Sequence, residues 1–165
     1  MNTLDWWGLV RASARYHNVM CHREIMFSEY FEDWEVKTEY SKEFVSLWSG
    51  WLCKENYHKL DEVTENEWSR FNDLLRRLAE NFSFEVVNCE LQSLTEVRDI
   101  NSVLSSYEES MNKDASKFTK LVIPELGCVI SEEWDYTYII WHKNNGAVEA
   151  LTPYIKAASL ESFHD

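Results

Sequence analysis

The sequence is poor in glycine and proline, with four and two of these residues in a chain of 165. This scarcity excludes collagen-like and low-complexity chains. The glycines, at positions 8, 50, 127 and 146, also stand far apart. A phosphate-binding loop or a dinucleotide fingerprint needs two or three glycines close together, so neither motif can be written on this chain.

Long apolar runs are absent as well. No stretch approaches the roughly 18 consecutive apolar residues that a membrane-spanning helix needs. Residues 1–10 carry neither the basic segment nor the apolar core of a secretory signal. We therefore expect a cytoplasmic protein without membrane contact. Disorder is excluded too, because hydrophobic residues make up 45% of the chain and aromatic residues 15%.

Basic residues are outnumbered, with 16 Lys and Arg against 29 Asp and Glu and a formal net charge of −13. Nucleic acid is a polyanion that binds proteins through Lys and Arg, so direct binding to DNA or RNA is not expected. An acidic surface attracts basic proteins and speeds their association. The sequence therefore predicts a basic protein partner. The alternative is that the charge only keeps the protein soluble.

The cysteines do not form a metal-binding motif. They are Cys21, Cys53, Cys89 and Cys128, and no two of them make a CxxC pair. His17 and Cys21 would share one face of a helix, close to His22, but such a pair supplies two of the four ligands that zinc requires. We expect no metal, no cofactor and reduced thiols.

No arrangement typical of catalysis is recognisable. The motifs GxSxG, HExxH and DxDxDG are absent from the sequence. Adjacent acids such as Glu32–Asp33 and Asp61–Glu62 could supply the two carboxylates of a glycosidase. In so acidic a chain they fit a solvated face better. The sequence predicts no catalytic residue and a protein that is not an enzyme.

The N-terminal half has the periodicity of helices. Apolar residues recur at steps of three and four over 9–34 and again over 41–52. A third apolar stripe over 64–82 begins with Thr64 and Glu67, whose spacing is that of a capping box. These patterns predict three or four helices.

The C-terminal half alternates between strand and helix patterns. We expect a strand over 84–91, a helix over 93–111 that begins with a Ser93–Glu96 capping box, strands over 121–130 and 134–142 joined by a turn at 131–133, a helix over 148–158 and an edge strand over 160–163. One face of the strand over 134–142 carries Trp134, Tyr136, Tyr138 and Ile140, and the other face is still half apolar, which predicts that the strand is covered on both sides.

Together these patterns predict an α+β fold, with a helical N-terminal half packed with a small, mostly antiparallel sheet and C-terminal helices. No linker rich in Gly, Pro or Ser divides the chain. We therefore expect one domain over 1–165, made of a helical part over 3–82 and a β-α-β-β-α-β part over 83–163.

Two segments combine acid with large aromatic side chains. Between residues 24 and 67 twelve acidic and four basic residues give a net charge of −8. The candidate partner-binding residues are Glu29, Glu32, Asp33, Trp34, Glu35 and Glu39 in a first patch and Glu132, Glu133, Trp134 and Asp135 in a second. In such patches aromatics anchor a contact and carboxylates steer the partner. The alternative is that the aromatics are core residues, with Trp134 anchoring a hairpin.

The segment 132–140, Glu-Glu-Trp-Asp-Tyr-Thr-Tyr-Ile-Ile, is followed by a break at Gly146 and a helix that carries Val148, Leu151 and Ile155. Over 121–163 this pattern resembles the small bacterial immunity proteins of polymorphic-toxin and contact-dependent-inhibition systems, in which an acidic strand often precedes a helix and a short last strand. The resemblance implies a protein that binds a basic toxin domain, for example a nuclease, and neutralises it.

Three other functions stay open at this stage. One is a DNA mimic that blocks a nucleic-acid-binding defence enzyme, although Lys37, Lys42, Lys54 and Lys59 interrupt the row of acids that mimicry needs. Another is a small hydrolase with dispersed Glu and His residues. The last is an adaptor subunit with an exposed apolar face. The sequence leaves the oligomeric state undetermined.

Overall fold

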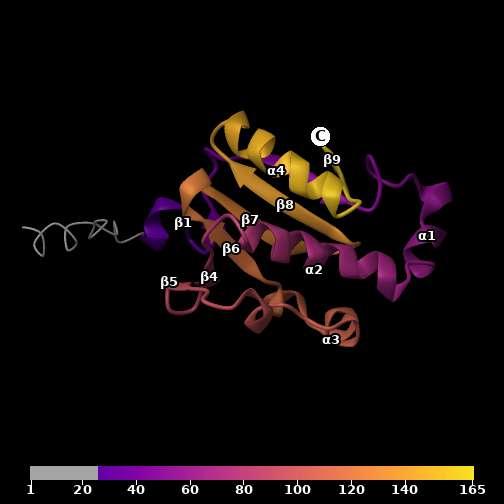
Figure 1. Ribbon diagram of the computed structural model, residues 1–165, viewed down its shortest axis with the longest axis horizontal. Coiled ribbons are helices and arrows are strands. Elements are labelled where there is room, and N and C mark those ends of the chain that lie inside the picture. Colours follow the sequence, from indigo (N-terminus) through magenta and orange to yellow (C-terminus); the bar gives the residue numbers. More distant parts are fainter. Residues whose placement is uncertain (1–25) are drawn as a thin grey trace, which may run out of the picture.

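The computed structural model describes residues 26–165 and shows an antiparallel sheet with helices on one face (Figure 1). The strands are β1 (Phe31–Glu32), β2 (Glu35–Val36), β3 (Ser41–Ser46), β4 (Glu85–Asn88), β5 (Ser93–Glu96), β6 (Lys120–Ile123), β7 (Cys128–Glu133), β8 (Thr137–His142) and β9 (Glu161–Phe163), and the helices are α1 (His58–Asp61), α2 (Glu65–Ala79), α3 (Tyr107–Asn112) and α4 (Asn145–Ala157). This mixture of helices with a mainly antiparallel sheet is an α+β fold, as predicted.

Seven strands form the main sheet in the order β5-β4-β6-β7-β8-β3-β9. Each neighbouring pair is antiparallel. Strand β3 comes early in the chain, yet it lies between the late strands β8 and β9. Its register pairs Ser41 with His142 and Ser46 with Thr137. The beginning of β3 therefore lies at the end of β8.

Helices α2 and α4 lie side by side on one face of this sheet (Figure 1). They bury Leu74 and Leu151 against Val45, Ile130 and Ile140 from three neighbouring strands. Helix α2 starts where its sequence predicts. The Thr64 Oγ1 accepts a hydrogen bond from the Glu67 backbone N–H, and the Glu67 carboxylate accepts one from the Thr64 backbone N–H. This capping box is confirmed.

The opposite face of the sheet is covered by the N-terminal hairpin of β1 and β2. A second core cluster joins Tyr30, Phe31 and Tyr40 to Val122 of β6 and Val129 of β7. Since the neighbouring residues of β6 and β7 belong to the first cluster, both strands are buried on both sides. Strand β8 is covered on both sides in the same way, as predicted, because Ile140 belongs to the first cluster and Trp141 packs against the second.

The prediction of a helical N-terminal half is wrong for the described residues. The expected helix over 9–34 overlaps them only from Met26, and there a 3-10 turn leads into the hairpin; its earlier part lies outside the described residues. The expected helix over 41–52 is strand β3 and a non-helical segment. Because Phe44 and Val45 are both buried, β3 shows no alternation of apolar and polar residues, and its spacing imitates a helix.

The predicted helix over 93–111 is also wrong. Residues Ser93–Glu96 form β5, which pairs with β4, so their spacing is not a capping box. The backbone N–H of Val97 then bonds the Phe84 carbonyl at 2.8 Å, which holds the chain beside the sheet. Only α3 is α-helical here. It begins at the genuine capping box of Ser106 and Glu109.

The C-terminal elements follow the predictions more closely. Helix α4 and strand β9 form where expected, and β9 is an edge strand. The turn expected at 131–133 is misplaced, since these residues belong to β7. The chain reverses at Trp134–Tyr136 instead, with Asp135 at φ 58° and Tyr136 at φ 54°. Because Asp135 and Tyr136 take the left-handed conformation, the chain leaves the extended conformation of β7 and turns back into β8.

Candidate partner-binding site

The two acidic patches of the sequence lie at opposite ends of the sheet. The first precedes β3, whose first residue Ser41 pairs with His142. The second occupies the β7–β8 turn, next to the pairing of Ser46 with Thr137. Five residue steps at about 3.3 Å each put roughly 17 Å between these two positions on the sheet. The patches are therefore separate from each other on the molecule.

The first patch surrounds the tip of the β1–β2 hairpin. Glu32, Asp33, Trp34 and Glu35 are exposed there, and Trp34 is 53% exposed. Asp33 and Trp34 both have positive φ, of 49° and 68°, as in a two-residue hairpin turn that normally carries Asn-Gly. Tryptophan at such a position is strained, and a strained exposed side chain suggests a role other than stability.

Two other acids of the first patch are engaged within the chain. The carboxylate of Glu39 pairs with Lys143, and this hydrogen bond holds the Glu39 pKa below its usual value. Lys143 also lies 4.9 Å from the centre of the Tyr40 ring. The Glu29 carboxylate accepts a hydrogen bond from the Met26 backbone N–H. The hairpin tip is therefore the part of this patch that faces outward.

The second patch borders a cavity of about 320 Å³, which we call the Trp134 pocket. Its aromatic walls are Trp68, Phe71, Phe118, Trp134, Tyr136 and Tyr138. They come from the first turns of α2, the segment before β6, the β7–β8 turn and β8. The end of α1 and helix α3 complete the lining. Six aromatic residues from separate segments thus meet around one hollow.

The inner wall of the Trp134 pocket is fixed by packing. Trp68 is only 8% exposed, and its indole Nε1–H donates a hydrogen bond to the Ser110 Oγ at 3.2 Å. The rings of Phe71 and Tyr138 have centroids 4.9 Å apart. Contacts of this kind hold the aromatic wall in place before any ligand arrives, which lowers the entropic cost of binding.

The outer wall is formed by the β7–β8 turn. Trp134 is 61% exposed, which rules out the alternative of a buried anchor for the hairpin. Its ring meets the ring of Phe118 edge to face at 4.8 Å. The neighbours Asp135 and Tyr136 carry the left-handed backbone. The large exposed side chain of Trp134 is therefore held in position by a turn in which two non-glycine residues take a left-handed conformation that costs free energy.

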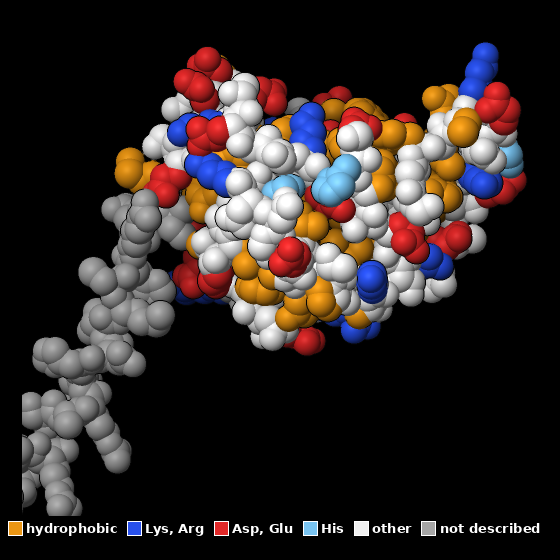
Figure 2. Space-filling model, turned by 90° about the horizontal axis from the view of Figure 1, so that it is seen from above, with side chains coloured by type: hydrophobic (Ala, Val, Ile, Leu, Met, Phe, Trp, Pro, Cys, Tyr) orange, Lys and Arg blue, Asp and Glu red, His pale blue; other side chains and the backbone are white. Residues whose placement is uncertain are grey.

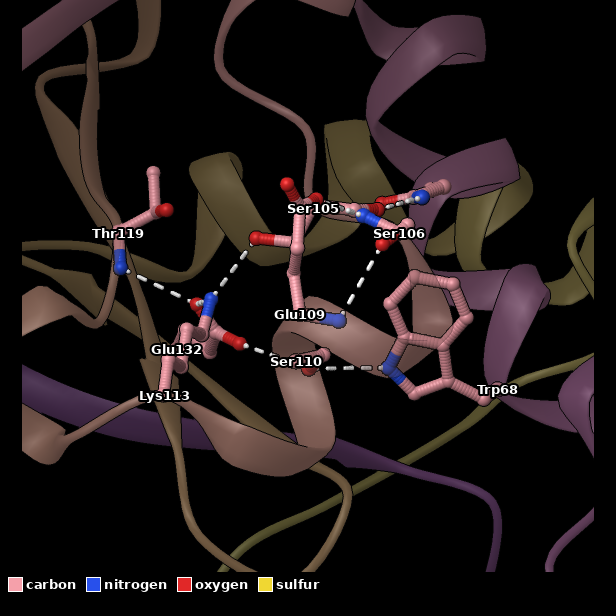
Figure 3. A network of polar contacts seen from close by, with 9 residues as sticks. Trp68, Ser105, Ser106, Glu109, Ser110, Lys113, Thr119 and Glu132 are labelled. Carbon is pink, nitrogen blue, oxygen red and sulfur yellow. Dashed lines mark hydrogen bonds and ion pairs between the residues drawn. The ribbon is translucent and has the colours of Figure 1, made fainter.

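Charge in the Trp134 pocket is of one sign. Its lining includes Asp61, Glu132, Glu133 and Asp135, and among the described residues that line it there is no Lys, Arg or His. Glu132 is neutralised from behind by Lys113, with Nζ 2.5 Å from Oε2 (Figure 3). The other three carboxylates form no ion pair with any residue in the part of the chain that the structure describes.

Figure 3 shows the polar network behind the pocket. The Glu132 carboxylate accepts hydrogen bonds from the Ser110 hydroxyl and the Thr119 backbone N–H as well as from Lys113. Lys113 also donates to the Ser105 hydroxyl. Helix α3 and the segment before β6 are thereby attached to β7, and this attachment shapes the pocket.

Two tyrosines that line the pocket, Tyr136 and Tyr138, have raised pKa values. Burial raises the pKa of Tyr138, and the nearby Glu132 carboxylate raises it further. Burial also raises the pKa of Tyr136, with smaller contributions from Tyr107, Asp61 and Asp135. Burial disfavours a charge of either sign, whereas the nearby carboxylates disfavour only a negative charge.

A second cavity of about 220 Å³ adjoins the Trp134 pocket and shares Leu60, Asp135 and Thr137 with it. Exposed apolar side chains gather around both cavities: Trp51 (54%), Tyr57 (56%), Met111 (43%) and Trp134 (61%). We call these four residues, together with Asp61, Glu133 and Asp135, the Trp134 face. Large exposed apolar residues rimmed by charge are typical of protein-binding surfaces.

The side of α4 and β9 differs from the Trp134 face. Figure 2 looks at the molecule from that side and shows acidic, basic and histidine side chains interspersed, with hydrophobic patches between them. Charges of both signs give no strong local field. This face therefore offers less to a highly charged partner.

Two further findings bear on the expectations from the sequence. Within residues 26–165, no helix is both long enough and apolar enough to cross a membrane. In the same range, no group of three or more His, Cys, Asp or Glu residues is arranged to hold a metal ion. The His17, Cys21 and His22 cluster lies outside the described residues.

The sequence predicts Glu132, Glu133, Trp134 and Asp135 as partner-binding residues, and the structure places all four in the lining of the Trp134 pocket. Most of the other walls of this pocket were not predicted from the sequence. Trp68 was assigned only to the core stripe of its helix, and Phe118 to no element. No local signal could have found them, because the contacts between these segments are long-range.

Searches of protein-family models, curated proteins and solved structures returned no match to this chain.

Proposed function

We propose that this chain is an acidic protein-binding module, an immunity-type inhibitor that binds and neutralises a basic toxin domain in the cytoplasm. The Trp134 face is its binding surface. The observation that carries the proposal is an exposed tryptophan, held at a strained turn, above an aromatic pocket lined by carboxylates.

The Trp134 face has the composition of an energetic hot spot. Binding energy at interfaces concentrates in a few large aromatic residues that fill pockets on the partner or form them. Trp134 and Trp51 are both more than half exposed, and both border a cavity. The hairpin tip has one exposed tryptophan, Trp34, and is the second candidate surface.

The charge of the chain supports a basic partner. A net charge of −13 on 165 residues creates a field that draws in cations and repels polyanions. Asp61, Glu133 and Asp135 extend that field to the Trp134 face. Carboxylates at the rim of an interface mainly raise the rate of association, and salt weakens this effect.

The assignment to inhibitors of toxins rests on the resemblance over residues 121–163. There the acidic end of β7 is followed by β8, α4 and the short edge strand β9, which is the order that the resemblance implies. Such an inhibitor needs no chemistry of its own, since covering the active cleft of the toxin is enough.

The experiment is to co-express this chain with each protein encoded beside its gene and to measure both complex formation and cell survival. We expect one neighbour to be toxic alone, to be basic, and to form a stable complex with this chain that restores growth. If no neighbouring product binds the chain, the proposal of an immunity-type inhibitor is wrong.

A matched pair of charge changes locates the surface. Asp61 and Glu62 are adjacent, both are exposed, and only Asp61 lines the Trp134 pocket. We expect Asp61→Asn to slow association with the partner at low salt more than Glu62→Gln does. Equal effects would indicate that only the overall charge matters.

A further inference from the structure

We propose that the Trp134 pocket receives a single arginine side chain of the partner, with its guanidinium between the aromatic walls and the carboxylates at the rim. This inference rests on the proposed function and deepens it, because it names the group that the pocket recognises.

The pocket has the size for one side chain rather than for a large ligand. Sites for small molecules span roughly 300–1,000 Å³, and at about 320 Å³ this cavity lies at the lower end. It opens beside Trp134, Asp135 and Asp61, all of which are exposed. A long, unbranched side chain that projects from a protein surface can enter such a hollow.

Its walls suit a flat cation. Arginine stacks on aromatic faces through its planar guanidinium and is more weakly hydrated than lysine, so it loses less on entering an aromatic pocket. Trp134 lies on the β7–β8 turn and Trp68 lies on α2, and both residues border the cavity. Tryptophan is the aromatic residue that binds cations best.

The carboxylates at the rim are available to the guanidinium. Glu133 accepts a hydrogen bond from the Ser131 hydroxyl at 2.9 Å, but neither it nor Asp61 or Asp135 pairs with a cation among the described residues. A guanidinium presents five N–H donors in a fixed plane, which suits carboxylates that approach from more than one side.

The chain itself already uses this chemistry next to the pocket. The Lys113 ammonium lies 5.7 Å from the centre of the Phe118 ring while it pairs with Glu132. Trp134 contacts the same Phe118 ring. Glu132 and the Phe118 ring thus hold the Lys113 ammonium just behind the wall of the pocket. The pocket itself is also lined by carboxylates and aromatic rings, but no Lys, Arg or His is among its described lining residues.

The test uses two small probes of nearly the same shape, one charged and one neutral. N-acetyl-arginine amide carries the guanidinium, and N-acetyl-citrulline amide carries a neutral urea of the same shape. Each is titrated into the full chain while the indole N–H signals of the eight tryptophans are followed by NMR. The Trp134 and Trp68 signals are assigned with Trp134→Phe and Trp68→Phe variants.

We expect the arginine probe to shift the Trp134 and Trp68 signals saturably and to bind at least about fivefold more tightly than the citrulline probe. The Asp135→Asn variant should weaken arginine binding several-fold. Asp33→Asn is the matched control, because it makes the same change at an exposed left-handed turn position at the other end of the sheet.

Three results would overturn the inference: equal binding of both probes, no effect of Asp135→Asn, or shifts confined to other tryptophans. If the partner binds this chain and the arginine probe does not, the pocket inference fails while the proposed function stands. If the arginine probe binds as expected and no neighbouring protein does, the proposed inhibitor function fails while the cation pocket stands.

Discussion

Lys113 and Glu132 form an ion pair inside the protein, with side chains that are only 10% and 13% exposed. The pair lies directly behind the Trp134 pocket and joins α3 to β7 through the network of Figure 3. Removal of one partner leaves the other charge buried without compensation, which is costly. The pair is therefore the structural support of the pocket.

Replacing Lys113 by methionine should lower the free energy of unfolding by about 3 kcal/mol, because the Glu132 carboxylate stays buried without its cation. Urea denaturation measures this change. Arg77→Met is the control, since Arg77 and Asp73 form a pair whose side chains are 43% and 44% exposed, and its loss should matter far less. Equal losses in the two variants would contradict the role given to Lys113.

Ser159→Gly should stabilise the protein by about 1 kcal/mol. Ser159 has φ 59° just after α4, where the N–H of Leu160 bonds the Ile155 carbonyl and the Ser159 N–H bonds the Lys156 carbonyl. This is a Schellman motif, which favours glycine at that position. Gly127→Ala, at φ 57°, is the reciprocal change and should destabilise by a similar amount. Thermal unfolding measures the stability of both variants. A Ser159→Gly variant that is less stable than the original protein would contradict this prediction.

Stability should fall at alkaline pH because two buried tyrosines resist ionisation. Burial, together with smaller contributions from neighbouring negative charge, raises the pKa of both Tyr30 and Tyr40 to about 12. In the unfolded chain these phenols ionise near their ordinary pKa of 10.0. The unfolded state therefore releases protons first and gains stability relative to the folded state between about pH 10 and 12.

Tyr40→Phe should make the free energy of unfolding less dependent on pH in that window. Chemical denaturation at several pH values measures the slope. The Tyr57→Phe variant serves as the control, since it removes the same hydroxyl group from a surface side chain that is 56% exposed. A slope that Tyr40→Phe leaves unaltered would argue against this cause.

Cys128 should be inert in the native protein. It is fully buried, and burial raises its pKa to about 12, so thiolate is scarce at neutral pH. Cys53 is exposed and should react with maleimide at once. Peptide mapping after brief labelling, with and without urea, distinguishes them. Rapid labelling of Cys128 without denaturant would mean that the sheet opens far more easily than its packing indicates.

The fold was predictable where sequence neighbours determine the structure. The Thr64–Glu67 capping box and a clear apolar stripe predict helix α2. The elements β7, β8 and α4 follow one another within a short stretch of chain, so local patterns predict them as well. Strand β3 was not predictable. The residues of its partner β8 lie between 91 (Ser46 to Thr137) and 101 (Ser41 to His142) positions further along the chain. Buried residues on both faces of β3 also remove the alternation that would identify a strand.

The site was predictable only in its charge and its exposed tip. Charge and aromatic density predict Glu132, Glu133, Trp134 and Asp135 as candidates, and these four residues border one cavity. The cavity beneath them depends on Trp68 and Phe118, which reach it from different segments. Periodicity assigns such residues to the core, because it cannot distinguish a wall that faces a hollow from one that faces a packed interior.

The most direct test of the central claim compares two tryptophans. Trp134→Ala and Trp34→Ala each remove one exposed indole from a hairpin turn, at opposite ends of the sheet. The dissociation constant for the toxic protein encoded beside this chain's gene is measured for both variants by surface plasmon resonance. We expect Trp134→Ala to weaken binding by about 30-fold, the effect of an interface hot spot, and Trp34→Ala to change it by less than about twofold. A large loss in Trp34→Ala with unchanged binding in Trp134→Ala would contradict the account and place the interface at the β1–β2 hairpin.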